Sequence, residues 1–254
     1  MRVTLSEVAK GRRGEVLAPV SSVLETGRVT VLAADTDQGP SVLSLILAGR
    51  MRPSSGEIHA DGGHSRRRLR RATALIDTPA VCEPAPTVAL RTVVAEELLF
   101  AHRRSDPIAV RRWLEEHGLA ELGDRSMMHV PAMTRLRALV ELALLRPGIE
   151  AVVLTSPERF GADVGELVAL ASEVAARGYA VAIVAGDTAA RLGAEELALR
   201  GATPAAPDDQ PPVPAAPEPA PAASSASADP APRRSPFDEP APDPAPEADA
   251  PRDR

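Results

Sequence analysis

A short stretch near the N-terminus combines residue types that suit the binding of phosphate. Residues 31–43 read VLAADTDQGPSVL, so an apolar strand enters a turn and an apolar helix follows, ending near Gly49. Backbone N–H groups at such a strand-to-helix turn can hold an anion, and the helix dipole favours negative charge there. A phosphate-binding loop also carries a lysine at this point, but this chain has Pro40. The stretch therefore predicts the shape of a phosphate loop without its cation.

Three other groups of reactive residue types are better explained by ordinary structural roles. Asp35 and Asp37 are separated by one residue in a turn, where carboxylates are common turn formers, so no metal site is predicted. Cys82 lies among prolines without a histidine nearby in the sequence, which gives a thiolate nucleophile little support. The basic run at 64–71, HSRRRLRR, could contact the phosphates of RNA or lipid, but it contains no aromatic residue. We favour a solvated loop, or a contact with the acidic C-terminal segment, for this run.

Composition divides the chain of 254 residues into a body and a tail. Residues 203–254 contain 16 of the 26 prolines and carry a net charge of −6, which predicts a disordered Pro/Ala-rich acidic tail. Residues 1–202 are formally neutral, which argues against nucleic acid as a partner. Their number suits one α/β domain. No apolar run reaches the length of a membrane helix and no signal-peptide pattern is present, so we expect a cytoplasmic protein.

Short β-like runs alternate with helical runs in the body. Strands are expected at residues 16–23, 28–33, 57–60, 73–76, 151–154, 180–184 and 196–200. Helices are expected at residues 41–47, 88–102, 107–117, 136–145 and 164–176. This order predicts an α/β fold with a mixed central sheet, helices on both faces and a small helical subdomain at about 87–135.

The segment from Thr26 to Gly62 resembles the ATP-binding subunits of ABC transporters, which are P-loop NTPases. It has the family's glycine turn, strand, loop, helix ending in LAG at 47–49, RPSSGEI at 52–58 and DG at 61–62. Residues 87–100, 118–125 and 154–158 fit later segments of the family in the right order, so the resemblance covers roughly residues 3–202. It implies an ABC-cassette domain at 1–202, ATP and Mg²⁺ as cofactors, and a membrane permease or a second cassette, as in a dimer, as partner.

The loop departs from the family pattern at most of its functional positions. Aligned on the LAG motif, the loop positions of the family fall on Ala34, Asp37, Gly39, Pro40, Ser41 and Val42. Of the three family glycines only Gly39 remains, and Pro40 replaces the lysine. Asp37 places a carboxylate where polyphosphate would lie, and like charges repel. Ser41 keeps the hydroxyl that the family uses for Mg²⁺.

The remaining functional positions of the family are also replaced. Its glutamine, the second glycine of its signature motif, its acidic pair and its switch histidine fall on Thr78, Met133, Thr155, Ser156 and Gly186. The only glutamines are at 38 and 210, and all five histidines precede residue 130, so a shifted alignment does not restore these groups. Glu158 is the nearest downstream acid, but a shift of two residues moves its side chain away from the strand end. We therefore predict no catalytic residue and no ATP or Mg²⁺ cofactor.

Three functions are compatible with this sequence. The favoured one is a non-hydrolytic binding or regulatory subunit, peripheral to the inner face of the membrane, docked on an ABC permease or paired with a competent ATP-binding subunit. By the resemblance, the permease-facing groove maps to about residues 78–104. The second is a working ATP-binding subunit that couples ATP hydrolysis to solute transport. The third is a soluble interaction protein without a membrane partner.

Overall fold

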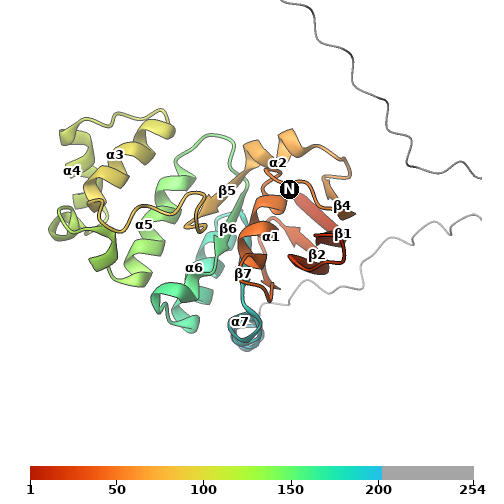
Figure 1. Cartoon of the computed structure of the whole chain (residues 1–254). Helices are drawn as coiled ribbons and strands as arrows, with labels where there is room; N and C mark the ends of the chain where they lie inside the picture. Colours follow the sequence, from red (N-terminus) through yellow and green to blue (C-terminus); the bar gives the residue numbers. More distant parts are fainter. Residues whose placement is uncertain (202–254) are drawn as a thin grey trace, which may run out of the picture. The chain divides into compact units, whose positions relative to one another are not determined.

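The computed structural model describes residues 1–201 (Figure 1). The tail that the sequence predicts to be disordered, 203–254, lies outside the described residues. Within residues 1–201, no helix is both long and apolar enough to cross a membrane.

The strands form two sheets. One is parallel and has the order β3-β7-β6-β5, built from Val29–Ala33, Ala180–Ala185, Ala151–Thr155 and Thr73–Ile76. The other is antiparallel and has the order β2-β1-β4, built from Leu17–Glu25, Arg2–Lys10 and Ser55–Ala60. The predicted α/β class is confirmed. The central sheet was predicted to be mixed, whereas it is wholly parallel and the antiparallel strands form a sheet of their own.

The helices lie on both faces of the parallel sheet. They are α1 (Gly39–Leu47), α2 (Arg66–Ala72), α3 (Leu90–Phe100), α4 (Pro107–Glu116), α5 (Ala132–Leu144), α6 (Val164–Ala176) and α7 (Asp187–Leu199). Figure 1 shows α5 and α6 on one side of β5, β6 and β7, and α1 with the antiparallel sheet on the other side. The segment predicted as a helical subdomain, 87–135, contains α3, α4, two 3-10 turns and the start of α5.

Alternation along the buried strands produces two apolar cores. In β6, Ala151 and Val153 join the core that holds α1 and the antiparallel sheet. Val152 and Leu154 join the core that holds α3, α5 and α6. Because both faces of this strand are covered, its first four residues, 151–154, are continuously apolar, as expected for a parallel strand.

Two local predictions were wrong. Residues 196–200, predicted as a strand, form the last turn of α7 and its C-cap, because Ala190, Gly193 and Leu197 recur at helical spacing and are buried together. The run 64–71, predicted as a solvated loop, forms α2 from residue 66 onward. Ser65 caps this helix by accepting a hydrogen bond from the backbone N of Arg68 at 3.2 Å. Leu69 of the helix is buried in the core that holds α1 and the antiparallel sheet.

Candidate functional site

The strand-to-helix loop is closed by its own hydrogen bonds. Ala34 is buried at the end of β3, residues 35–38 are exposed, and α1 begins at Gly39. The backbone N of Gly39 donates to the carbonyl O of Thr36 at 2.9 Å, and the Thr36 hydroxyl donates to the carbonyl O of Val16 at 2.6 Å. A proline follows at position 40 and has no N–H to donate. The first turn of α1 therefore offers fewer backbone donors to an anion than the layout of the loop suggests.

The predicted loop residues occupy different environments around this turn. Gly39 is required sterically, because a Cβ there would lie 2.8 Å from the Thr36 hydroxyl. Pro40 is buried at the start of α1, where its fixed φ suits a helix. Ser41 is half-buried, and Val42 is packed in the apolar core. Asp37 is exposed, so its carboxylate faces solvent at the mouth of the loop.

Three buried hydroxyl groups form a hydrogen-bonded chain at the ends of the strands beside this loop. The Thr155 hydroxyl at the end of β6 donates to the Ser44 hydroxyl on α1 at 2.8 Å. The Thr155 and Thr78 hydroxyls are also 2.8 Å apart. All three residues are almost fully buried. The chain is uncharged, and it links α1, β6 and the segment that follows β5.

Ser156 and Gly186 lie at the same edge of the parallel sheet, after β6 and β7. Ser156 adopts a left-handed backbone conformation, with φ of 45°, and its N donates to the carbonyl O of Val184 at 2.7 Å. Gly186 precedes α7, and its N donates to Glu158 Oε1 at 3.4 Å. Glu158 Oε2 is buried without a hydrogen-bond partner among residues 1–201. Glu158 is two residues beyond Ser156 in the sequence. Its carboxylate nevertheless lies at the carboxyl ends of β6 and β7, next to Gly186.

The structure brings the predicted nucleotide-site positions at the strand ends together, but it places Met133 elsewhere. Ala34, Thr155 and Gly186 follow or end neighbouring parallel strands, so their segments meet at one sheet edge. Met133 instead lies in the first turn of α5, half-buried against the core of the helical segment.

A buried ion pair near this edge could not be recognised in the sequence. Asp77 and Arg135 are 5% and 3% exposed, and they form two hydrogen bonds of 2.6 and 2.9 Å. The pair joins the segment after β5 to α5. The guanidinium of Arg135 also stacks over the Phe160 ring at 4.3 Å. The partners are 58 positions apart, and neither lies in a recognisable motif.

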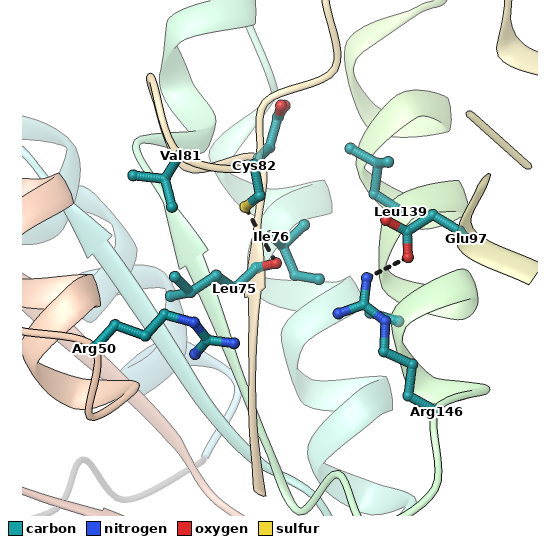
Figure 2. Close-up of a pocket in the computed structure, with 10 residues that line it drawn as sticks. Arg50, Leu75, Ile76, Val81, Cys82, Glu97, Leu139 and Arg146 are labelled. Carbon is teal, nitrogen blue, oxygen red and sulfur yellow. Dashed lines mark hydrogen bonds and ion pairs between the residues drawn. The ribbon is translucent and has the colours of Figure 1, made fainter. Parts of the chain in front are cut away.

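A cavity of about 170 Å³ lies between β5, the segment after it, α3 and α5 (Figure 2). Arg50 and Arg146 point into it from opposite sides, and Arg146 is paired with Glu97 of α3. Val81 is exposed at its edge, and the Cys82 sulfur is turned toward the carbonyl O of Leu75, 3.5 Å away.

Two ionisable groups of this cavity have shifted pKa values. Burial raises the pKa of the Cys82 thiol, although other atoms of this residue are exposed, because the sulfur itself faces inward. Partial desolvation, with a contribution from the like charge of Arg146, lowers the pKa of Arg50. An arginine remains a cation at neutral pH despite such a shift. The cavity therefore combines a neutral thiol with two guanidinium groups.

The parallel sheet has a strand-to-helix loop at its carboxyl edge, helices on both faces and an added antiparallel sheet. In open α/β sheets of this kind, ligands bind at the carboxyl ends of the strands. No family model matches the sequence, and no curated protein matches it.

Solved structures identify the particular fold as that of an ABC transporter ATP-binding cassette. A structure of cbiO1 from Clostridium perfringens, described as part of the ABC transporter complex cbiONQ, is 19% identical, with a TM-score of 0.51, covering 72% of this chain and 77% of that one. An ATP-binding subunit of an ABC transporter is 18% identical, with a TM-score of 0.50, covering 74% and 80%. A putative ABC transporter ATP-binding protein from Pyrococcus furiosus is 14% identical, with a TM-score of 0.54, covering 74% and 92%. Sequence identities of 14–19% establish the fold alone. They confirm the ABC-cassette fold that the sequence predicted.

Proposed function

We propose that this chain is an ABC-cassette-like subunit that does not hydrolyse ATP and acts as a binding or regulatory subunit of a membrane transporter. The observation that carries this proposal is the chemistry at the end of β6. Thr155 and Ser156 are the residues there, and the Thr155 hydroxyl is already engaged in a buried, neutral hydrogen-bond chain. Hydrolysis of a nucleoside triphosphate needs carboxylates that hold Mg²⁺ and orient the attacking water. Hydroxyl groups supply neither function at neutral pH.

The loop supports the same proposal, because its residues do not fit a triphosphate. The Gly39 N–H is engaged by Thr36, Pro40 has no N–H, and the exposed Asp37 carboxylate repels an anion. We therefore infer that ATP and Mg²⁺ are not resident cofactors. The shape of the loop would then be kept because it connects β3 to a helix that the core requires.

A steady-state phosphate-release assay tests the absence of hydrolysis. Wild-type protein with Mg-ATP should release phosphate at the rate of a protein-free blank. Ser156→Ala and Glu158→Gln should leave this rate unchanged. Glu158 is included because its carboxylate approaches Gly186 at the sheet edge. Turnover above the blank that is lost in either variant would overturn the proposal and favour the working ATP-binding subunit.

We propose that a partner helix docks over the mouth of the cavity between α3 and α5 and inserts a side chain into it, because about 170 Å³ is too small for a helix itself. The Clostridium perfringens protein of the same fold is part of an ABC transporter complex. In this chain, Leu99 and Phe100 at the end of α3 are 62% and 63% exposed, and Val81 is 46% exposed. Within residues 1–201, Arg50 donates only to backbone carbonyl groups, whereas Arg146 is already paired with Glu97. Together with Arg50, these apolar groups suit an amphipathic helix that carries an acidic residue, such as a cytoplasmic helix of a permease.

Photo-crosslinking from these side chains tests the partner. A photoreactive amino acid in place of Phe100 should form a crosslink in cells to a protein with several membrane spans. The double variant Val81→Asp and Leu99→Asp should reduce the fraction of full-length chain that sediments with membranes. The matched control is Ile108→Asp on α4, where the side chain is 79% exposed. Equal membrane fractions for all three proteins would contradict docking through this surface and favour a soluble interaction protein.

A further inference from the structure

A tight hairpin turn after β4 places two histidines opposite each other. Ala60 and Gly63 exchange both backbone hydrogen bonds, at 2.8 and 3.0 Å. Asp61 and Gly62 between them both have positive φ, 50° and 78°, which is the backbone of a type I′ turn. The next residue outward on each side is a histidine, His59 or His64.

The register of this hairpin explains why the two imidazoles are close. The pair that follows a mutually hydrogen-bonded pair in an antiparallel ladder is a non-hydrogen-bonded pair, in which side chains lie closest. The ring centroids of His59 and His64 are 3.8 Å apart. Both side chains lie on the face of the sheet opposite the core, because Ile58 and Ala60 occupy the core face.

Glu57 completes a group of three potential ligands on this face. It lies two residues before His59, so both side chains emerge on the same side of β4. Glu57 Oε2 is 3.1 Å from His59 Nε2. One ligand atom each from Glu57, His59 and His64 lie within 4.8 Å of one another. This is the one such group of three or more found in residues 1–201.

These distances suit a single small cation of borderline softness. Ligands at zinc–nitrogen distances of about 2.0–2.1 Å in a tetrahedron are roughly 3.4 Å apart. The Glu57–His59 separation is already close to this value, and only His64 needs to move inward. Gly62 and Gly63 precede His64, and neither is packed tightly, since a Cβ at Gly62 would meet no atom within 4 Å. The fourth position faces solvent and would be filled by water.

We propose that Glu57, His59 and His64 form a binding site for a divalent transition metal, with Zn²⁺ as the ion that the donor set fits best. Two imidazole nitrogens and one carboxylate oxygen are ligands that Zn²⁺, Ni²⁺ and Co²⁺ accept, whereas Mg²⁺ and Ca²⁺ prefer oxygen alone. The site lies on the antiparallel sheet, outside the loop and the strand ends described above. The sequence predicted no metal site, because the spacing of Asp35 and Asp37 is typical of a turn; His59 and His64 come together only in the folded hairpin. Binding would tie β4 to the segment that leads into α2.

A titration of tag-free full-length protein tests this site. Isothermal titration with ZnCl₂ in a Cys82→Ser background, which removes the only thiol, should give one site per chain. His59→Gln, His64→Gln or Glu57→Gln should each weaken binding by at least about 10-fold. The matched control is His102→Asn, which removes another exposed imidazole and keeps a residue that tolerates the positive φ of 56° at that position.

Two further readouts identify how the metal is held. Co²⁺ in place of Zn²⁺ should give the intense visible absorption of a tetrahedral complex, and this absorption should be lost in His64→Gln. Free Zn²⁺ at 100 times its dissociation constant should raise the Tm by roughly 5–10 °C in the Cys82→Ser protein. The shift should be absent in His59→Gln. If Zn²⁺ binds equally well to the wild type, the His59 and His64 variants and the His102 control, the proposal is wrong, and these side chains make only the Glu57–His59 ion pair and the contact between the two rings.

Discussion

Replacing Asp77 by asparagine removes one charge from the ion pair that joins the segment after β5 to α5. Both partners are nearly fully buried, with 5% and 3% exposure, and they form two hydrogen bonds. Asparagine keeps the size of aspartate and tolerates the left-handed conformation of this residue, whose φ is 53°. The substitution therefore tests the charge rather than the backbone. It leaves the Arg135 guanidinium buried without a counter-charge.

The expected cost follows from this burial. Removing one partner of a buried pair typically costs about 3–5 kcal/mol, because the remaining charge is uncompensated. For a domain of this size, each kcal/mol lowers the Tm by roughly 2–4 °C, so we expect a decrease of about 6–20 °C. The matched control is Glu173→Gln, which breaks the Arg137–Glu173 pair, whose side chains are 52% and 50% exposed. An exposed pair is worth about 0–1 kcal/mol.

Urea unfolding followed by circular dichroism measures both free energies in the full-length protein. A third variant, Asp77→Asn combined with Arg135→Met, removes the orphaned charge and should recover at least half of the lost stability. The reasoning is refuted if Asp77→Asn lowers the free energy of unfolding no more than Glu173→Gln does. It is also refuted if the double variant is less stable than Asp77→Asn alone.

Three other substitutions or reactions test separate parts of the structure. Thr155→Val breaks the buried hydroxyl chain, so that Ser44 and Thr78 each lose a hydrogen bond. It should lower the free energy of unfolding in urea by about 1–3 kcal/mol. An unchanged unfolding midpoint would show that the chain does not form. Gly56→Ala would place a Cβ 2.1 Å from a backbone oxygen, so it should destabilise by at least ~2 kcal/mol more than Gly27→Ala, which has a similar positive φ but open space around it. Because burial raises the pKa of the Cys82 thiol above its ordinary value, iodoacetamide should modify it more slowly in the folded than in the urea-unfolded protein at about pH 8.5. The difference should shrink as pH rises and the folded thiol ionises. Equal rates at pH 8.5 would mean that the sulfur is solvated.

The parallel strands could be predicted from sequence because each is covered on both faces. Residues 151–154 and 180–185 are continuously apolar and short, which few other elements imitate.

The strand β1 could not be predicted from the alternation of its residues. Val3 and Leu5 alternate correctly, but the register shifts between Leu5 and Val8, and Glu7 adopts a positive φ of 50°. This bulge interrupts the period of two on which strand prediction depends.

The candidate site was predictable in position but not in its contacts. Parallel strands bring their carboxyl ends to one edge, so the segments holding Ala34, Thr155 and Gly186 had to be neighbours. The partner of Thr155 on α1, Ser44, is 111 positions away and belongs to no motif. Such contacts depend on the packing of α1 against the sheet, which local sequence does not specify. The histidine pair was equally hidden, because it depends on the type of one two-residue turn.

The loop between β3 and α1 keeps the layout of a phosphate loop, and we propose that it does not hold a triphosphate. Isothermal titration of Mg-ATP into the full-length protein measures this binding. We expect no saturable binding below the millimolar range, with identical traces for wild-type protein and Ser41→Ala. One site per chain with micromolar affinity, lost in Ser41→Ala, would show that the loop does bind a triphosphate.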